Sequence, residues 1–215
     1  MKTGVIFDLD GTLLDTLEDL KDAVNVALGQ FGYPSRTLAE VRRFVGNGAG
    51  LLIQRAVPDG VEYAPVLAAF QVYYRENCRV KTAPYKGVVE ALAALQKKYP
   101  IAIVTNKPDG AAKALCAEYF KGVFALGEQS GCPRKPAPDM VRKAMAAIGV
   151  ERCVYVGDSE VDVETAKNAD VPCLTVLWGF RDREELERLG ARYFCDDPAQ
   201  LPQAVETVLD GDIKM

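Results

Sequence analysis

Apolar positions follow one pattern in residues 16–82 and another in the rest of the chain. Outside that block, short apolar runs alternate with segments whose apolar residues recur every three or four positions. A short apolar run bounded by turn residues predicts a buried strand, and the second pattern predicts an amphipathic helix. Repeated strand–helix units predict a parallel sheet with helices on both faces.

The strands and helices of this sheet can be assigned from the two patterns. Six apolar runs are expected to form strands, the last of them at an edge: residues 5–7, 101–104, 123–126, 153–156, 172–177 and 193–195. Helical spacing predicts the covering helices: residues 88–98, 109–119, 138–148, 161–169, 183–189 and 198–209.

Residues 16–82 are expected to be entirely helical. Thr37 and Glu40 form a capping box, which marks the start of a helix. The glycine-rich residues 46–50 predict a flexible turn between two helices. The helices expected in this block cover residues 17–31, 37–44, 51–57 and 62–79.

This helical block is an insertion after the first strand. It is expected to lie above the carboxyl edge of the sheet, where it can act as a lid. The hinges are expected near residues 15–16 and 82–84, and Tyr73 and Tyr74 are expected to pack between the block and the sheet domain.

Composition narrows the classes of function. The 215 residues carry a net charge of −4, which argues against nucleic acid and anionic membranes as partners. No apolar run approaches the roughly 20 residues of a membrane span, and Asp8 interrupts the N-terminal one, so we expect a cytoplasmic protein without a signal peptide. The six cysteines form no C-x-x-C pair and are expected to be reduced.

The chain contains no histidine, which excludes histidine-based triads, zinc–histidine sites and imidazole bases. Acid–base chemistry near neutral pH is therefore expected from carboxylates, Lys, Tyr or Cys.

Two carboxylates end the first predicted strand. Asp8 and Asp10 lie on the same side of an extended chain, and Gly11 then allows the backbone to turn. Carboxylates this close repel each other unless a cation lies between them. Because Mg²⁺ prefers oxygen ligands, including substrate phosphate, the stretch predicts metal-assisted phosphoryl transfer.

The string Asp-Leu-Asp-Gly-Thr-Leu-Leu-Asp at residues 8–15 resembles the first motif of the haloacid dehalogenase superfamily. The resemblance implies a Rossmann-like catalytic core formed by residues 1–15 and 83–215, with residues 16–82 as an inserted helical cap. It also implies that Asp8 is a nucleophile forming an aspartyl-phosphate, and that Asp10 is the general acid–base.

Three later segments resemble the other motifs of this superfamily. Thr105 and Asn106 follow the second strand, Lys135 precedes a helix, and Asp158 and Asp162 follow the fourth strand. The resemblance implies phosphate binding by Leu9, Asp10, Thr105, Asn106 and Lys135. It implies catalysis by Asp8, Asp10 and Lys135. It implies Mg²⁺ binding by Asp8, Asp10, Asp158 and Asp162, with Asp162 acting through water or by orienting Asp158 and Lys135.

The string Val-Gly-Asn-Gly at residues 45–48 resembles phosphoglycolate phosphatases and assigns substrate specificity to Gly46, Asn47 and Gly48. The expected protein is a Mg²⁺-dependent phosphatase of a small phosphorylated metabolite, either monomeric or homodimeric. The alternatives are a β-phosphoglucomutase-like sugar phosphomutase, a pyrophosphatase and an inactive binding protein on the same fold. Five charged residues receive no assigned role: Arg42, Arg43, Arg55, Arg134 and Glu160.

Overall fold

A six-stranded parallel sheet, in the order β5-β4-β1-β6-β7-β8, forms the larger part of the computed structural model, which describes residues 2–212. β1 lies inside the sheet and pairs with both β4 and β6, and β8 lies at an edge, so the fold expectation is confirmed. The strands are β1 (Thr3–Phe7), β4 (Ile101–Pro108), β5 (Phe124–Glu128), β6 (Arg152–Gly157), β7 (Cys173–Val176) and β8 (Tyr193–Cys195).

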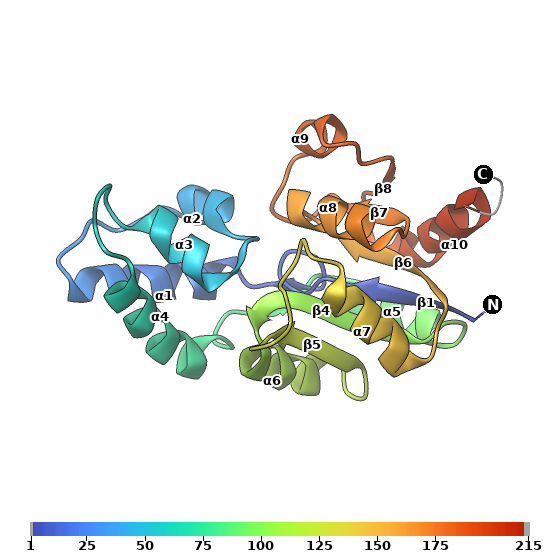
Figure 1. The fold of residues 1–215 in the computed structure, drawn as a ribbon, viewed down its shortest axis with the longest axis horizontal. Coiled ribbons are helices and arrows are strands. Elements are labelled where there is room, and N and C mark those ends of the chain that lie inside the picture. Colours follow the sequence, from blue (N-terminus) through green and yellow to red (C-terminus); the bar gives the residue numbers. More distant parts are fainter. Residues whose placement is uncertain (1, 213–215) are drawn as a thin grey trace.

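Helices cover both faces of the sheet (Figure 1). Val5 and Phe7 of β1 pack in one apolar cluster with α5 (Val88–Gln96), α6 (Asp109–Tyr119) and α10 (Leu201–Asp212). Ile6 points to the opposite face, against α7 (Asp139–Ile148) and α8 (Glu160–Ala169). Because β1 is buried on both faces, its apolar side chains fix the position of the residues that follow it.

The helical block packs around a separate apolar cluster, which Phe180 of the sheet domain also joins. Its helices are α1 (Leu17–Gln30), α2 (Leu38–Phe44), α3 (Gly48–Ala56) and α4 (Ala64–Asn77). The capping box at Thr37 is present at the start of α2. In Figure 1 the block lies beside the carboxyl edge of the sheet.

A two-stranded antiparallel ribbon joins the helical block to the sheet domain. It consists of β2 (Leu14–Asp15) and β3 (Ala83–Pro84). The buried carboxylate of Asp19 braces the same junction, because it accepts the N–H groups of Lys81 at 3.0 Å and Thr82 at 2.9 Å. The hinges predicted near residues 15–16 and 82–84 coincide with this ribbon.

Two sequence-based assignments were wrong. The turn does not extend over residues 46–50, because α3 already begins at Gly48; it is confined to residues 45–47, where Gly46 has a φ of +123°. β4 does not end at Val104 but continues to Pro108 through an irregular pairing with β5. This longer strand carries Lys107 to the edge of the sheet.

The remaining elements complete the sheet domain: α9 (Arg183–Arg188) and a 3₁₀ turn (Pro198–Gln200) that precedes α10. Within residues 2–212, no helix combines the length and apolar character that crossing a bilayer requires.

Candidate active site

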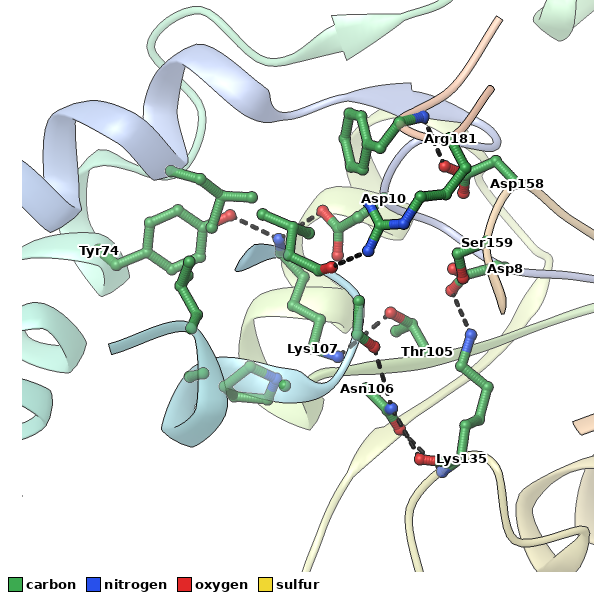
Figure 2. A pocket seen from close by; sticks show the side chains of 18 of the residues that line it. Asp8, Asp10, Tyr74, Thr105, Asn106, Lys107, Lys135, Asp158, Ser159 and Arg181 are labelled. Carbon is green, nitrogen blue, oxygen red and sulfur yellow. Dashed lines mark hydrogen bonds and ion pairs between the residues drawn. The ribbon is translucent and has the colours of Figure 1, made fainter. Parts of the chain in front are cut away.

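A pocket separates the carboxyl edge of the sheet from the helical block (Figure 2). On the sheet side, β1 supplies Asp8 and Asp10. β4 and the loops after β5, β6 and β7 supply the other polar residues: Thr105, Asn106, Lys107, Lys135, Asp158, Ser159 and Arg181. On the opposite side, the helical block supplies mainly apolar residues: Leu20, Val45, Ala49, Leu52 and Phe70.

Asp8 is the first residue after β1 and is only 8% exposed. Its N–H donates to the carbonyl of Val156 at 2.8 Å, and Nζ of Lys135 lies 2.8 Å from its Oδ1. Burial raises the pKa of Asp8 to about 7, with the positive charge of Lys135 opposing this rise. The predicted nucleophile and the predicted lysine therefore lie in contact.

Asp162 is fully buried and is surrounded by donors. Its Oδ1 accepts from Lys135 at 2.8 Å and from the hydroxyl of Tyr155 at 3.1 Å. Its Oδ2 accepts from the N–H groups of Asp158 and Ser159 and from the Ser159 hydroxyl. Because both oxygens are occupied by protein donors, this arrangement favours the orienting role among the two roles expected for Asp162.

Asp158 lies in a cradle that only glycine permits. Its Oδ1 accepts from the hydroxyl of Thr12 at 3.0 Å, and its Oδ2 accepts from the N–H of Phe180 at 2.7 Å. A Cβ at Gly11, where φ is +82°, would lie 2.4 Å from Asp158 Oδ2, and a Cβ at Gly179 would lie 2.4 Å from its Cβ. Burial, reinforced by the neighbouring carboxylates, raises the pKa of Asp158 well above its usual range.

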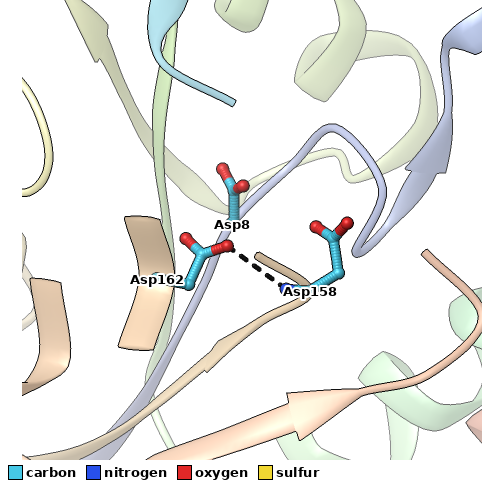
Figure 3. A group of neighbouring side chains, drawn as sticks. All are labelled: Asp8, Asp158 and Asp162. Atoms are coloured by element: carbon cyan, nitrogen blue, oxygen red, sulfur yellow. Dashed lines mark hydrogen bonds between the residues drawn. The ribbon is translucent and has the colours of Figure 1, made fainter. Parts of the chain in front are cut away.

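The acidic group fits a divalent cation. Asp8, Asp158 and Asp162 each offer a carboxylate oxygen within 4.8 Å of the others (Figure 3). Oδ1 of Asp8 is buried and accepts no well-aligned hydrogen bond. Buried, mutually repelling carboxylates of this kind suit a hard cation with oxygen ligands. Asp10 does not belong to this group, so its assignment as a metal ligand stays a prediction.

Asp10 instead faces Lys107, a residue that the sequence analysis did not select. Nζ of Lys107 lies 2.8 Å from Oδ1 of Asp10 and donates to the hydroxyl of Tyr74 in α4 at 2.5 Å. Burial opposes the charged form of Lys107, but Asp10 and Tyr74 hold its pKa above the usual range. Strand alternation after Thr105 is the sequence signal that could have identified Lys107.

Thr105 and Asn106 occupy the expected place in the pocket. The Asn106 side chain donates to the carbonyl of Lys135 at 3.0 Å and accepts from its N–H at 2.8 Å. It also donates to the carbonyl of Gly46 in the helical block at 3.3 Å. Asn106 therefore holds the loop that carries Lys135 and also contacts the helical block.

Arg181, also not selected from the sequence, connects the sheet domain to the helical block. Its guanidinium donates to the carbonyls of Arg42 at 3.0 Å and Val45 at 2.8 Å. Glu160 holds it in place through two contacts, 2.7 Å to Nε and 3.1 Å to Nη2. Glu160, which had no assigned role, thereby orients the residue that anchors the loop before Gly46.

The predicted specificity residues divide into two groups. Gly46 and Gly48 line the pocket, whereas Asn47 does not. The amide oxygen of Asn47 accepts from Arg55 at 2.8 Å. The two glycines therefore shape the pocket, and Asn47 and Arg55 stabilise the loop that carries them.

Comparisons with known proteins agree with this geometry. Residues 5–176 match the haloacid dehalogenase-like hydrolase family. A phosphoglycolate phosphatase of Mesorhizobium japonicum is 36% identical over 197 residues, which cover 85% of this chain and 86% of the relative. One of Rhodospirillum rubrum is 36% identical over 219 residues, covering 94% and 90% of the two chains.

Solved structures show the same likeness. A candidate phosphoglycolate phosphatase from Lactobacillus delbrueckii superposes with a TM-score of 0.89 at 37% identity, covering 95% of this chain and 99% of that one. CbbY from Rhodobacter sphaeroides, in complex with phosphate, superposes with a TM-score of 0.76 at 24% identity over 96% of this chain and 100% of that one. The second likeness concerns the fold alone.

Proposed function

This chain belongs to the haloacid dehalogenase-like hydrolase family, and from that premise we propose that it is a Mg²⁺-dependent phosphatase of a small phosphorylated carboxylic acid such as phosphoglycolate. One observation carries the proposal. Asp8 lies at the end of β1 with the ammonium group of Lys135 at 2.8 Å and Asp158 in the same acidic group. This arrangement supports the roles proposed for Asp8 as nucleophile, for Lys135 as charge-stabilising cation and for the acidic group as a site for a divalent ion.

The chemistry would proceed in two steps. A carboxylate oxygen of Asp8 attacks phosphorus, and the bond to the leaving alcohol oxygen breaks as Asp10 gives that oxygen a proton. Water then attacks the aspartyl-phosphate, Asp10 takes up its proton, and Asp8 and inorganic phosphate are released. Lys135 stabilises the negative charge that develops on the phosphoryl oxygens.

A divalent cation would be held by Asp8 and Asp158 and would neutralise charge on the phosphoryl group. Asp162 keeps Lys135 and the turn after β6 in place by accepting hydrogen bonds from five donor groups. Thr105 lies in the same pocket with a hydroxyl available to phosphate oxygens.

The substrate assignment is supported by the relatives named phosphoglycolate phosphatase and by the pocket. The mainly apolar side chains of the helical block fill the side facing away from Asp8, which favours a substrate with a compact organic part. Gly46 and Gly48 lie at this side without any side chain of their own.

The test is phosphate release from 2-phosphoglycolate with Mg²⁺, measured for the wild type, for Asp8→Asn and for Asp22→Asn as a matched surface control. We expect Asp8→Asn to lose activity by at least about 10³-fold, because an amide is no nucleophile here, while Asp22→Asn keeps it. Chelation of the metal should abolish release. Full activity in Asp8→Asn would disprove the mechanism, and release that requires a bisphosphate activator would indicate a mutase instead.

A further inference from the structure

A second buried ammonium group lies in the pocket, apart from Lys135. The Lys107 side chain is 2% exposed and comes from the last residues of β4. Its Nζ contacts Asp10 on the sheet side and Tyr74 on the side of the helical block, and it lies 4.7 Å from the centre of the Tyr74 ring. Burying an ammonium group costs free energy unless anions and hydrogen-bond acceptors neutralise its charge.

Three cationic side chains line the pocket among the residues that the structure describes: Lys107, Lys135 and Arg181. Lys135 donates hydrogen bonds to Asp162 and Tyr155 and forms an ion pair with Asp8. The guanidinium of Arg181 directs its hydrogen bonds to Glu160 and to two carbonyls of the helical block. Four of the five N–H groups of Arg181 are thus engaged, and both cations are held mainly by partners within the protein.

Lys107 makes fewer contacts with polar partners than the other two cations. An ammonium group has three N–H donors, and Asp10 and Tyr74 occupy two of them. The third is left for a ligand in the pocket. The neighbouring surface from the helical block is apolar, with Leu20, Leu52 and Phe70, so an anion placed there has little else to neutralise it.

We propose that Lys107 binds the carboxylate of the substrate. It thereby selects phosphorylated carboxylic acids over phosphate esters of the same size whose organic part is uncharged. The inference rests on the proposed phosphatase function and adds a specificity-determining residue to it. The phosphate end is bound near Asp8 and Lys135, and the carboxylate end reaches the ammonium group beside Tyr74. The two halves of this second subsite come from different parts of the chain, Lys107 from the sheet domain and Tyr74 from the helical block.

The experiment compares two esters that differ in one group: 2-phosphoglycolate and 2-hydroxyethyl phosphate. kcat/KM is measured for both with Mg²⁺ in the wild type, Lys107→Met and Lys107→Arg. The wild type should prefer the acid by about 10- to 100-fold, as expected for one charge-assisted hydrogen bond. Lys107→Met should bring the ratio close to one, mainly through the KM for the acid, and Lys107→Arg should retain part of the preference.

The ratio separates recognition from any general loss of rate, because both esters use the same phosphoryl chemistry. Tyr74→Phe serves as the matched control: it removes the hydroxyl but leaves the ammonium group, so the preference should persist. If Lys107→Met keeps the wild-type ratio of kcat/KM for the two esters, the inference is overturned. If Lys107→Met does not fold, Lys107→Gln enters the same comparison.

Failure of the proposed function gives a different result. A wild type that hydrolyses neither ester is not the proposed phosphatase. The carboxylate subsite is then tested by glycolate alone, which should raise the melting temperature of the wild type and not that of Lys107→Gln. Equal protection of both proteins would overturn the subsite independently of any turnover.

Discussion

Arg181 provides a direct test of how the helical block is held over the site. The replacement Arg181→Met removes the guanidinium but keeps a long apolar side chain of comparable reach. It deletes the hydrogen bonds to the carbonyls of Arg42 and Val45, and it releases Glu160, whose side chain is 30% exposed and can be hydrated.

The size of the effect follows from these contacts. A hydrogen bond with a charged partner contributes about 1.5–3 kcal/mol. We call the arrangement in which the helical block covers the pocket the closed arrangement. Two such bonds between the sheet domain and the block stabilise it by at least about 3 kcal/mol, which corresponds to roughly a 100-fold change in the equilibrium constant between the closed arrangement and one without these bonds. If substrate binds the closed arrangement, its apparent affinity falls in proportion to the closed fraction.

The assay measures KM for 2-phosphoglycolate together with urea unfolding. Arg181→Met should raise KM by about 10- to 100-fold. Arg183→Met is the matched control, because Arg183 contacts residues of the sheet domain: it forms ion pairs with exposed Glu187 and Asp196, which contribute about 0–1 kcal/mol, and stacks on Phe194. A KM within about threefold of the wild type in Arg181→Met would show that other contacts hold the block, and the reasoning would fail.

Three further results are expected. In the metal-free protein, burial raises the pKa of Asp8 to about 7, so the folded chain retains a proton that the unfolded chain loses near pH 4. The free energy of unfolding, measured by urea titration, should therefore fall as the pH rises from about 4 to about 7. Saturating Mg²⁺ should flatten this dependence on pH. Asp162→Asn should cost about 3–5 kcal/mol by the same titration, since it removes the fully buried one of the two carboxylates that neutralise the buried Lys135; a loss below about 1 kcal/mol would contradict this. Gly179→Ala places a methyl group 2.4 Å from Asp158 and should weaken divalent-cation binding measured by calorimetry, whereas Gly110→Ala, which meets nothing within 4 Å, should not.

The sheet and most of its helices could be predicted because local patterns encode them. β1 is buried on both faces and reads as a continuous apolar run, and α2 begins at a capping box that is visible in the sequence. The start of α3 could not be placed in this way, because Gly48 and Gly50 are poor helix formers on their own and are held in the helix by its packing in the block.

The site was predictable where a residue follows a strand and not where it contacts the helical block. Asp8, Lys135 and Asp158 come together as their positions in the chain indicated. Lys107 was missed because the apolar run ends at Val104, although the strand continues beyond it. Arg181 was missed because its partners, the carbonyls of Arg42 and Val45, depend on how two separately packed units meet.

The short ribbon of β2 and β3 has a consequence for how enzymes of this architecture diversify. Since the chain leaves the sheet domain at Asp15 and re-enters it at Ala83 on adjacent strands, the whole inserted segment can be exchanged between homologues without moving a single strand of the sheet. The sheet domain and the inserted block are thereby encoded in separable stretches of the gene, and the block can be altered by recombination while the residues at the strand ends are kept.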